Sequence, residues 1–200
     1  MRKPGAKMPQ KDNEIRVFFA IELPETIKLF LKQISAELGQ CGGDVRWVNP
    51  TGMHLTIKFL GEIRSDLVQI IEQEVRPLFA SQKPSVHHLA RVGAFPDLKR
   101  PRVVWVGCSD DSRALVPLVS RLEEALARLG FPKEKRAFQP HLTLGRIRSN
   151  KGISGLVEGV RERMEISGPQ FNADHAVLFQ SVLKPSGAEY SRLLTFQFSG

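Results

Sequence analysis

Hydrophobic residues follow two alternating patterns along this chain. Residues 15–21 are mostly β-branched and aromatic, which is typical of a buried strand. In residues 25–38 apolar residues recur every three or four positions and glycines follow, as in an amphipathic helix. The two patterns predict strands at 15–21, 45–48, 54–60, 86–92, 102–107, 141–145, 164–166, 173–181 and 191–198, and helices at 25–38, 65–79, 110–129 and 152–160.

Capping residues set the expected helix boundaries. Ser65 is the predicted N-cap of the second helix, and Asp110 or Asp111 opens the third. Gly130 and Pro132 end the third helix.

The order of elements repeats in the two halves of the chain. In each half a strand and an amphipathic helix precede a strand that begins His-Leu-Thr, at His54 and at His141. No Gly/Ser-rich linker separates the halves. We therefore expect one α+β domain over residues 14–200, in which two related lobes enclose a cleft. Residues 1–13 read as a disordered basic tail.

Charge and composition limit the kinds of partner that this chain is expected to bind. The chain has 29 Lys and Arg against 21 Asp and Glu, and its net charge of +8 suits a polyanion such as RNA. Cys41 and Cys108 lack metal-binding spacing and imply no disulfide scaffold. No apolar run is long enough to cross a bilayer or to form a signal peptide. We expect a cytoplasmic monomer without a membrane, metal or cofactor partner.

The two His-Leu-Thr strands carry the candidate chemistry. Because side chains alternate along a strand, His54, Thr56 and Lys58 should share one face, with apolar neighbours on the buried face. The same alternation places His141 and Thr143 on one face of the later strand.

A pair of histidines can divide proton donation and proton acceptance near neutral pH, which is the equipment for phosphodiester hydrolysis. Thr56 and Thr143 can donate hydrogen bonds to phosphate oxygens, and Arg146 and Lys58 can add positive charge.

Other readings of single residues stay open. One His-x-Thr tripeptide is a weak motif, and its duplication carries the argument. We expect Lys58 to be a solvated strand residue rather than a phosphate ligand. The adjacent His87 and His88 should point to opposite faces, which disfavours a shared metal site, and His175 stands alone. The aromatic residues that could stack on a base or pack in the core are Trp47, Phe95 and Tyr190.

These motifs resemble the two-histidine (2H) phosphoesterase superfamily, and within it the RNA 2′,3′-cyclic phosphodiesterases once described as 2′-5′ RNA ligases. The resemblance runs from Arg16 through most of the chain. It rests on Arg16–Pro24, Trp47, His54–Glu62, Pro101–Gly107 and Pro140–Arg146, with Ser181–Leu183 and Gly187–Tyr190 near the C-terminus. No catalytic position departs from the pattern, although the basic extension before Asn13 is longer than the pattern requires.

The resemblance implies a bilobal α+β fold with pseudo-twofold symmetry, in which the two HxTx motifs face each other across a central cleft. It also implies that His54 is the proton donor, that His141 is the proton acceptor, and that no metal is needed. The expected reaction opens 2′,3′-cyclic phosphate ends of RNA to 2′-phosphates.

Two competing functions remain open at this stage. The same histidines can run the reverse reaction, 2′-5′ RNA ligation, or the chain can be an RNA-binding module without significant turnover. Candidate substrates are tRNA halves, short oligonucleotides, cyclic nucleotides and small cyclic phosphates.

Overall fold

The structure is a computed structural model, and it describes residues 13–109, 113–185 and 187–200. Residues 1–12 of the predicted tail and the predicted helix start at Asp110 or Asp111 lie outside these ranges. The helices are α1 (Glu25–Gln40), α2 (Leu67–Ala80), α3 (Leu115–Arg128) and α4 (Ile153–Arg161), with a 3-10 turn η1 (Pro50–Gly52). The strands are β1 (Glu14–Glu22), β2 (Asp44–Trp47), β3 (His54–Arg64), β4 (Ser85–Phe95), β5 (Val103–Ser109), β6 (His141–Ser149), β7 (Gln170–Ala173), β8 (His175–Lys184) and β9 (Gly187–Gln197).

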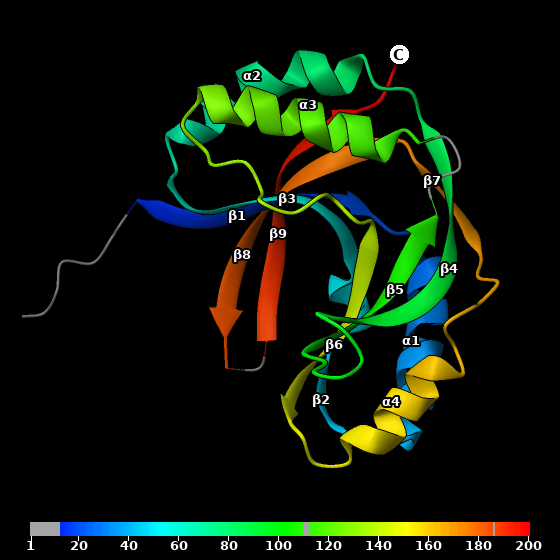
Figure 1. Cartoon of the computed structure of the whole chain (residues 1–200). Coiled ribbons are helices and arrows are strands. Elements are labelled where there is room, and N and C mark those ends of the chain that lie inside the picture. The colour runs from blue at the N-terminus through cyan, green and yellow to red at the C-terminus, as the bar shows by residue number, and fades with distance from the viewer. Residues whose placement is uncertain (1–12, 110–112, 186) are drawn as a thin grey trace, which may run out of the picture.

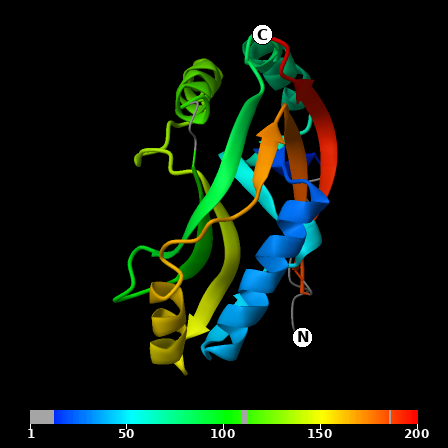
Figure 2. The ribbon, with the colours of Figure 1, turned by 90° about the vertical axis from the view of Figure 1, so that its right-hand side faces the viewer.

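Two antiparallel sheets form the centre of the molecule (Figure 1). The first sheet has the order β3-β1-β8-β9, and the second has the order β2-β6-β5-β4-β7. Helices α2 and α3 contact the first sheet, and α1 and α4 contact the second (Figure 2). The expected α+β fold with paired lobes and outer helices is therefore confirmed.

The two lobes do not correspond to the two halves of the sequence. After β1, the chain enters the second lobe through α1 and β2, and then returns to the first sheet as β3. The later repeat does the converse, because α3 leaves the second sheet to cover the first before β6 returns. Each lobe thus depends on strands or helices from both repeats, which ties the lobes into one packed unit.

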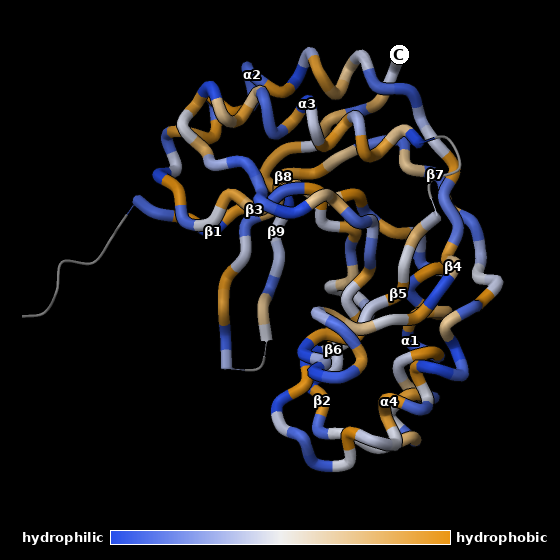
Figure 3. The backbone as a smooth tube through the Cα atoms, in the orientation of Figure 1, coloured by the Kyte–Doolittle hydropathy of each residue, from blue (hydrophilic) through white to orange (hydrophobic). Residues whose placement is uncertain are grey.

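Apolar side chains cover both faces of the first sheet. Phe19 of β1 packs against Phe79 of α2 and Phe196 of β9, with ring centroids 5.7 and 5.9 Å apart respectively. Because side chains alternate, the neighbouring Phe18 lies in a smaller cluster on the other face with Ala20, Val177 and Phe179. Helices α2 and α3 alternate apolar and polar residues along their length (Figure 3), as expected for helices that bury one side.

Two predicted strands differ from the structure. Residues 164–166 form no strand; Ile166 N–H donates to Ala90 O and Gly168 N–H to Leu89 O, and Pro169, which has no N–H, then interrupts any ladder. The predicted strand 173–181 corresponds to β8 (His175–Lys184), except that its first residue, Ala173, is the last residue of β7 (Gln170–Ala173). β7 pairs with β4 in the second sheet, and β8 pairs with β1 in the first. The change of sheet falls at Asp174 and His175, which interrupt the apolar run, and the sequence prediction did not use this interruption.

The second helix also starts later than predicted. Asp66 rather than Ser65 occupies the N-cap of α2, and its side chain makes no capping bond. Ser65 instead pairs with Asn13, with its backbone N–H 2.8 Å from Asn13 O. α3 begins at Leu115, after the gap in the described residues. None of the described helices has the length and apolarity needed to cross a bilayer.

Candidate active site

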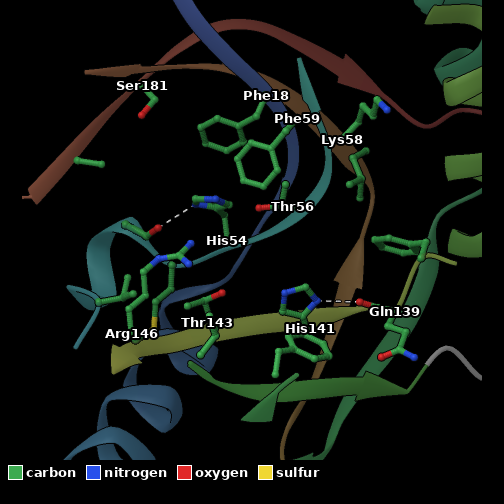
Figure 4. Close-up of a pocket in the computed structure, with 18 of the residues that line it drawn as sticks. Phe18, His54, Thr56, Lys58, Phe59, Gln139, His141, Thr143, Arg146 and Ser181 are labelled. Atoms are coloured by element: carbon green, nitrogen blue, oxygen red, sulfur yellow. Dashed lines mark hydrogen bonds between the residues drawn. The ribbon is translucent and has the colours of Figure 1, made fainter. Parts of the chain in front are cut away.

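A cavity of about 1220 Å³ lies between the two sheets, where β3 and β6 approach each other (Figure 4). The side chains predicted for the site all line this cavity: His54, Thr56, His141, Thr143 and Arg146. Sequence positions that are far apart are thus brought to one place by the pairing of the lobes.

The alternation predicted for the two motifs is present in the structure. Leu55 and Ile57 of β3 are buried, whereas His54 and Thr56 are partly exposed to the cavity. On β6 the leucines that flank Thr143 are completely buried in the same way. The buried leucines anchor each strand in the core and so hold the polar residues toward the cleft.

Lys58 departs from this pattern. The prediction that it shares a face with His54 and Thr56 is wrong. Phe19 of β1 pairs with Lys58, and Ala20 pairs with Thr56, so Ile57 is an extra residue in a β-bulge. The bulge reverses the alternation beyond it. Lys58 is 4% exposed, and its side chain points away from the histidines in Figure 4.

The ammonium group of Lys58 is bound on the far side of the sheet. It donates hydrogen bonds to Glu123 Oε1 at 2.9 Å and to Pro132 O at 2.8 Å. The expectation of a solvated lysine is therefore also wrong, although atoms of Lys58 border the cavity. Phe59 takes the cavity-facing position instead and is 51% exposed.

Both catalytic candidates have the same imidazole orientation. His54 Nδ1 lies 2.8 Å from Gly52 O, and His141 Nδ1 lies 2.8 Å from Gln139 O (Figure 4). Since a carbonyl oxygen only accepts, Nδ1 carries the proton in each neutral ring. Nε2 of each neutral ring then carries a lone pair that can accept a proton. Neither Nε2 makes a hydrogen bond to any described residue.

Aromatic rings surround His54 more closely than His141. Phe18 and Tyr190 have ring centroids 4.6 and 5.0 Å from that of His54. Burial lowers the pKa of His54 to about 4, while the bond to the Gly52 carbonyl acts in the opposite direction. His54 is therefore neutral at pH 7 in the free protein. His141 meets the edge of Phe95 at 4.9 Å.

Positive charge dominates the cavity. The charged residues that line it are Arg16, Lys58, Glu134, Arg136 and Arg146. Arg146 is exposed and makes no ion pair with any residue in the described ranges. Its guanidinium group is thus available to an anion, for which two parallel N–H donors provide a matching shape.

Several residues that line the cavity were not predicted for the site from the sequence. Arg136 and Gln139 belong to no recognisable motif, and Arg16 and Ser181 lie in the matching stretches without an expected role in the site. The packing of the lobes brings all four to the cleft. Of the aromatic candidates, Phe95 and Tyr190 line the cavity, while Trp47 packs against the core.

The remaining histidines lie elsewhere. None of His87, His88 and His175 lines the cavity. His87 is completely buried in β4, with Nε2 2.7 Å from Ser85 Oγ. His175 lies beside Asp174 and Glu22. Within the described ranges, no group of three metal-ligating side chains is arranged to hold a metal ion.

Comparison with known families supports the internal duplication. The LigT-like phosphoesterase model matches the chain twice, at residues 21–105 and 106–190, so that each copy contains one His-Leu-Thr motif. The chain belongs to the LigT-like phosphoesterase family. These are the two-histidine phosphoesterases that the motifs resemble, and the family assignment from sequence is confirmed.

Members of the family match this chain over most of its length. An RNA 2′,3′-cyclic phosphodiesterase of Archaeoglobus fulgidus is 33% identical over 92% of this chain and 100% of its own. The protein of the same name from Methanocaldococcus jannaschii is 31% identical over 88% of this chain and 96% of its own. The crystal structure of TT0787 of Thermus thermophilus has the same fold, with a TM-score of 0.78 at 24% identity over 93% of this chain and 99% of its own.

Proposed function

We propose that this chain is an RNA 2′,3′-cyclic phosphodiesterase that uses His54 and His141 as an acid–base pair. The observation that carries the proposal is the shared imidazole orientation, with a free Nε2 on each ring in one positively charged cavity. The curated relatives with this activity in their names match nearly the whole chain. We also place the enzyme in the cytoplasm, as a monomer that needs no metal or cofactor.

In the proposed mechanism, Nε2 of His141 removes a proton from water as the water oxygen attacks phosphorus. His54, protonated at Nε2, gives its proton to the 3′ oxygen of the ribose as the bond between phosphorus and that oxygen breaks. The product is a 2′-phosphate monoester with a free 3′-hydroxyl. Thr56, Thr143 and Arg146 hold the phosphate oxygens, where negative charge is present throughout the reaction.

The low pKa of His54 places a condition on this assignment. A neutral His54 cannot donate from Nε2, so the bound phosphate must raise its pKa. An opposite charge within about 4–6 Å raises the pKa of a histidine, by roughly 1–3 units in typical cases. The negative charge of the bound substrate then favours the protonated ring, and His54 takes this proton from solvent.

We expect this rise to be visible by NMR. In the free protein the His54 ring should titrate near pH 4, and saturating inorganic phosphate should move the midpoint upward by at least about one unit. His175, outside the cavity, is the control in the same spectra. If the titration midpoint of His54 does not change when phosphate is bound, then bound phosphate does not stabilise the protonated ring, and His54 is not the proton donor proposed here.

The same shift predicts how stability changes with pH. In the unfolded chain His54 titrates near 6.5, and in the folded chain it titrates near 4. Between these values the unfolded state binds more protons, so this group lowers the free energy of unfolding as the pH falls from 6.5 toward 4.

The product of hydrolysis tests the function and the donor assignment together. Adenosine 2′,3′-cyclic phosphate, incubated with the enzyme in EDTA, should yield adenosine 2′-phosphate by phosphorus NMR. Magnesium in place of EDTA should leave the rate unchanged. Formation of the 3′-phosphate would show that the 2′ oxygen is the leaving group, and it would contradict the assignment of His54 as the donor. Absence of hydrolysis under both conditions would contradict the proposed function.

Replacing Arg146 by alanine should lower kcat/KM by about 10-fold or more, because a charge-assisted phosphate contact is lost. Arg148→Ala is a matched control, since Arg148 lies on the same strand and does not line the cavity. Both variants should unfold at the temperature of the parent protein. Equal kinetics for the two variants would remove Arg146 from the phosphate site.

A further inference from the structure

A second hollow, of about 530 Å³, opens beside the catalytic cavity. Its lining consists of Phe59 and Leu60 from β3 and of residues 131–136, which follow α3. Phe59, Glu134 and Arg136 line both spaces, so the two are adjacent. The proposed chemistry uses no residue that lines the second hollow alone.

The combined space exceeds what a single terminal nucleotide needs. Pockets that bury most of a drug-sized ligand have volumes of about 300–1,000 Å³. The catalytic cavity alone has about 1220 Å³, and the second hollow extends it in one direction. A ligand that continues beyond the reacting phosphate therefore has a place to go.

The charges around the second hollow favour a polyanion. Lys133, Glu134, Lys135 and Arg136 line it, and all four are exposed. Within the described part of the chain, Lys135 and Arg136 make no ion pair, and Lys133 only reaches Glu124 at 3.9 Å. The single acid, Glu134, lies 3.9 Å from the ammonium group of Lys58.

An aromatic surface accompanies these cations. Phe59, turned toward the cavity by the β-bulge, lies between the two spaces and has an exposed ring. Phe131 lines the second hollow from the opposite element. Exposed rings next to cations are the combination that binds single-stranded nucleic acid, since bases stack on the rings and phosphates pair with the cations.

The loop of residues 131–136 is held in place by hydrogen bonds to Lys58 and Glu123. Lys58 donates to Pro132 O at 2.8 Å, and Glu134 N–H donates to Glu123 Oε1 at 3.0 Å. Glu123 in turn accepts from Lys58. This network fixes the backbone of residues 132–134 next to β3, so little ordering of the loop is required when a ligand binds.

We propose that the second hollow binds the nucleotides on the 5′ side of the terminal cyclic phosphate. The substrate class is then a single-stranded RNA end rather than a free cyclic mononucleotide. This inference rests on the proposed function and extends it, because the hollow determines which cyclic phosphates are opened efficiently.

The test compares two substrates with the same reacting group. One is adenosine 2′,3′-cyclic phosphate, and the other is a five-nucleotide RNA that ends in it. The parent enzyme should have a kcat/KM at least about 5-fold higher for the RNA, the effect of one stacked base. In the K133Q/K135Q variant this advantage should fall by about 5-fold or more, with kcat/KM for the mononucleotide unchanged.

The control variant is K32Q/K83Q, which removes the same charge from two exposed lysines that line neither space. It should keep the advantage for RNA. K135E, at a lysine without an ion pair in the described ranges, is a second test variant should the double variant be less stable. For K133Q/K135Q the slope of log KM against log salt concentration should become shallower by up to about 1.4, for RNA only.

Binding separates the two ways of failing. Fluorescence anisotropy of a labelled five-nucleotide RNA with a 2′-phosphate end reports on the second hollow without turnover. K133Q/K135Q should weaken this binding more than K32Q/K83Q does. Equal losses in the two variants, or equal kinetics on both substrates in the parent enzyme, would overturn the inference. If the parent binds RNA in this way but opens neither substrate, the proposed function fails and the binding site stands.

Discussion

Replacing either His54 or His141 by alanine should lower kcat for cyclic phosphate opening by about 100-fold to 10,000-fold, the contribution typical of a general acid or base. The reason is that each ring supplies one proton transfer and no other histidine in the described ranges lines the cavity to replace it. Single-turnover rates with the five-nucleotide RNA give the loss without interference from product release.

RNA binding should persist in the same variants. Affinity comes from the arginines and lysines around the cleft, which these substitutions leave in place. His175→Ala, a change outside the cavity, is the control and should keep its turnover. The parent enzyme should show a bell-shaped pH profile, whose two apparent pKa values belong to the pair. Retention of more than a tenth of the parent rate by either alanine variant would contradict the two-histidine mechanism.

Lys58→Met should lower the free energy of unfolding by about 3 kcal/mol, because it leaves the partly buried carboxylate of Glu123 without its cation. The Lys58 side chain is 2% exposed and that of Glu123 is 14% exposed, so water can solvate the stranded carboxylate only in part. The carbonyl of Pro132 loses its donor as well. Urea unfolding followed by circular dichroism measures the difference.

Lys184→Met is the matched control, since it breaks an ion pair with Glu189 whose side chains are 47% and 60% exposed. A pair in that environment contributes about 0–1 kcal/mol. Equal urea midpoints for the two methionine variants would show that the Lys58 network is not a stabilising element. Because the network also holds residues 132–134, Lys58→Met should reduce kcat/KM more for the five-nucleotide RNA than for the mononucleotide.

Local patterns in the sequence were sufficient for most elements and for the core of the site. Helix and strand periods identified α1 and β1, and the duplicated His-Leu-Thr tripeptides identified both cavity-lining histidines. These features are local because side-chain alternation and helical spacing depend only on neighbours along the chain. The apolar residues beside each histidine were enough to predict which face of its strand is buried.

The tertiary structure decided what depends on a partner strand or on another lobe. The bulge at Ile57, which buries Lys58 and exposes Phe59, arises from the register between β1 and β3. The change of sheet between β7 and β8 follows from their partners, because β7 pairs with β4 in the second sheet and β8 pairs with β1 in the first. The low pKa of His54 comes from burial, to which rings distant in the sequence, such as that of Tyr190, contribute. The second hollow depends on the loop that Lys58 holds through Pro132 O. Register, desolvation and loop placement are set by contacts between distant segments, and the sequence pattern of one segment does not contain them.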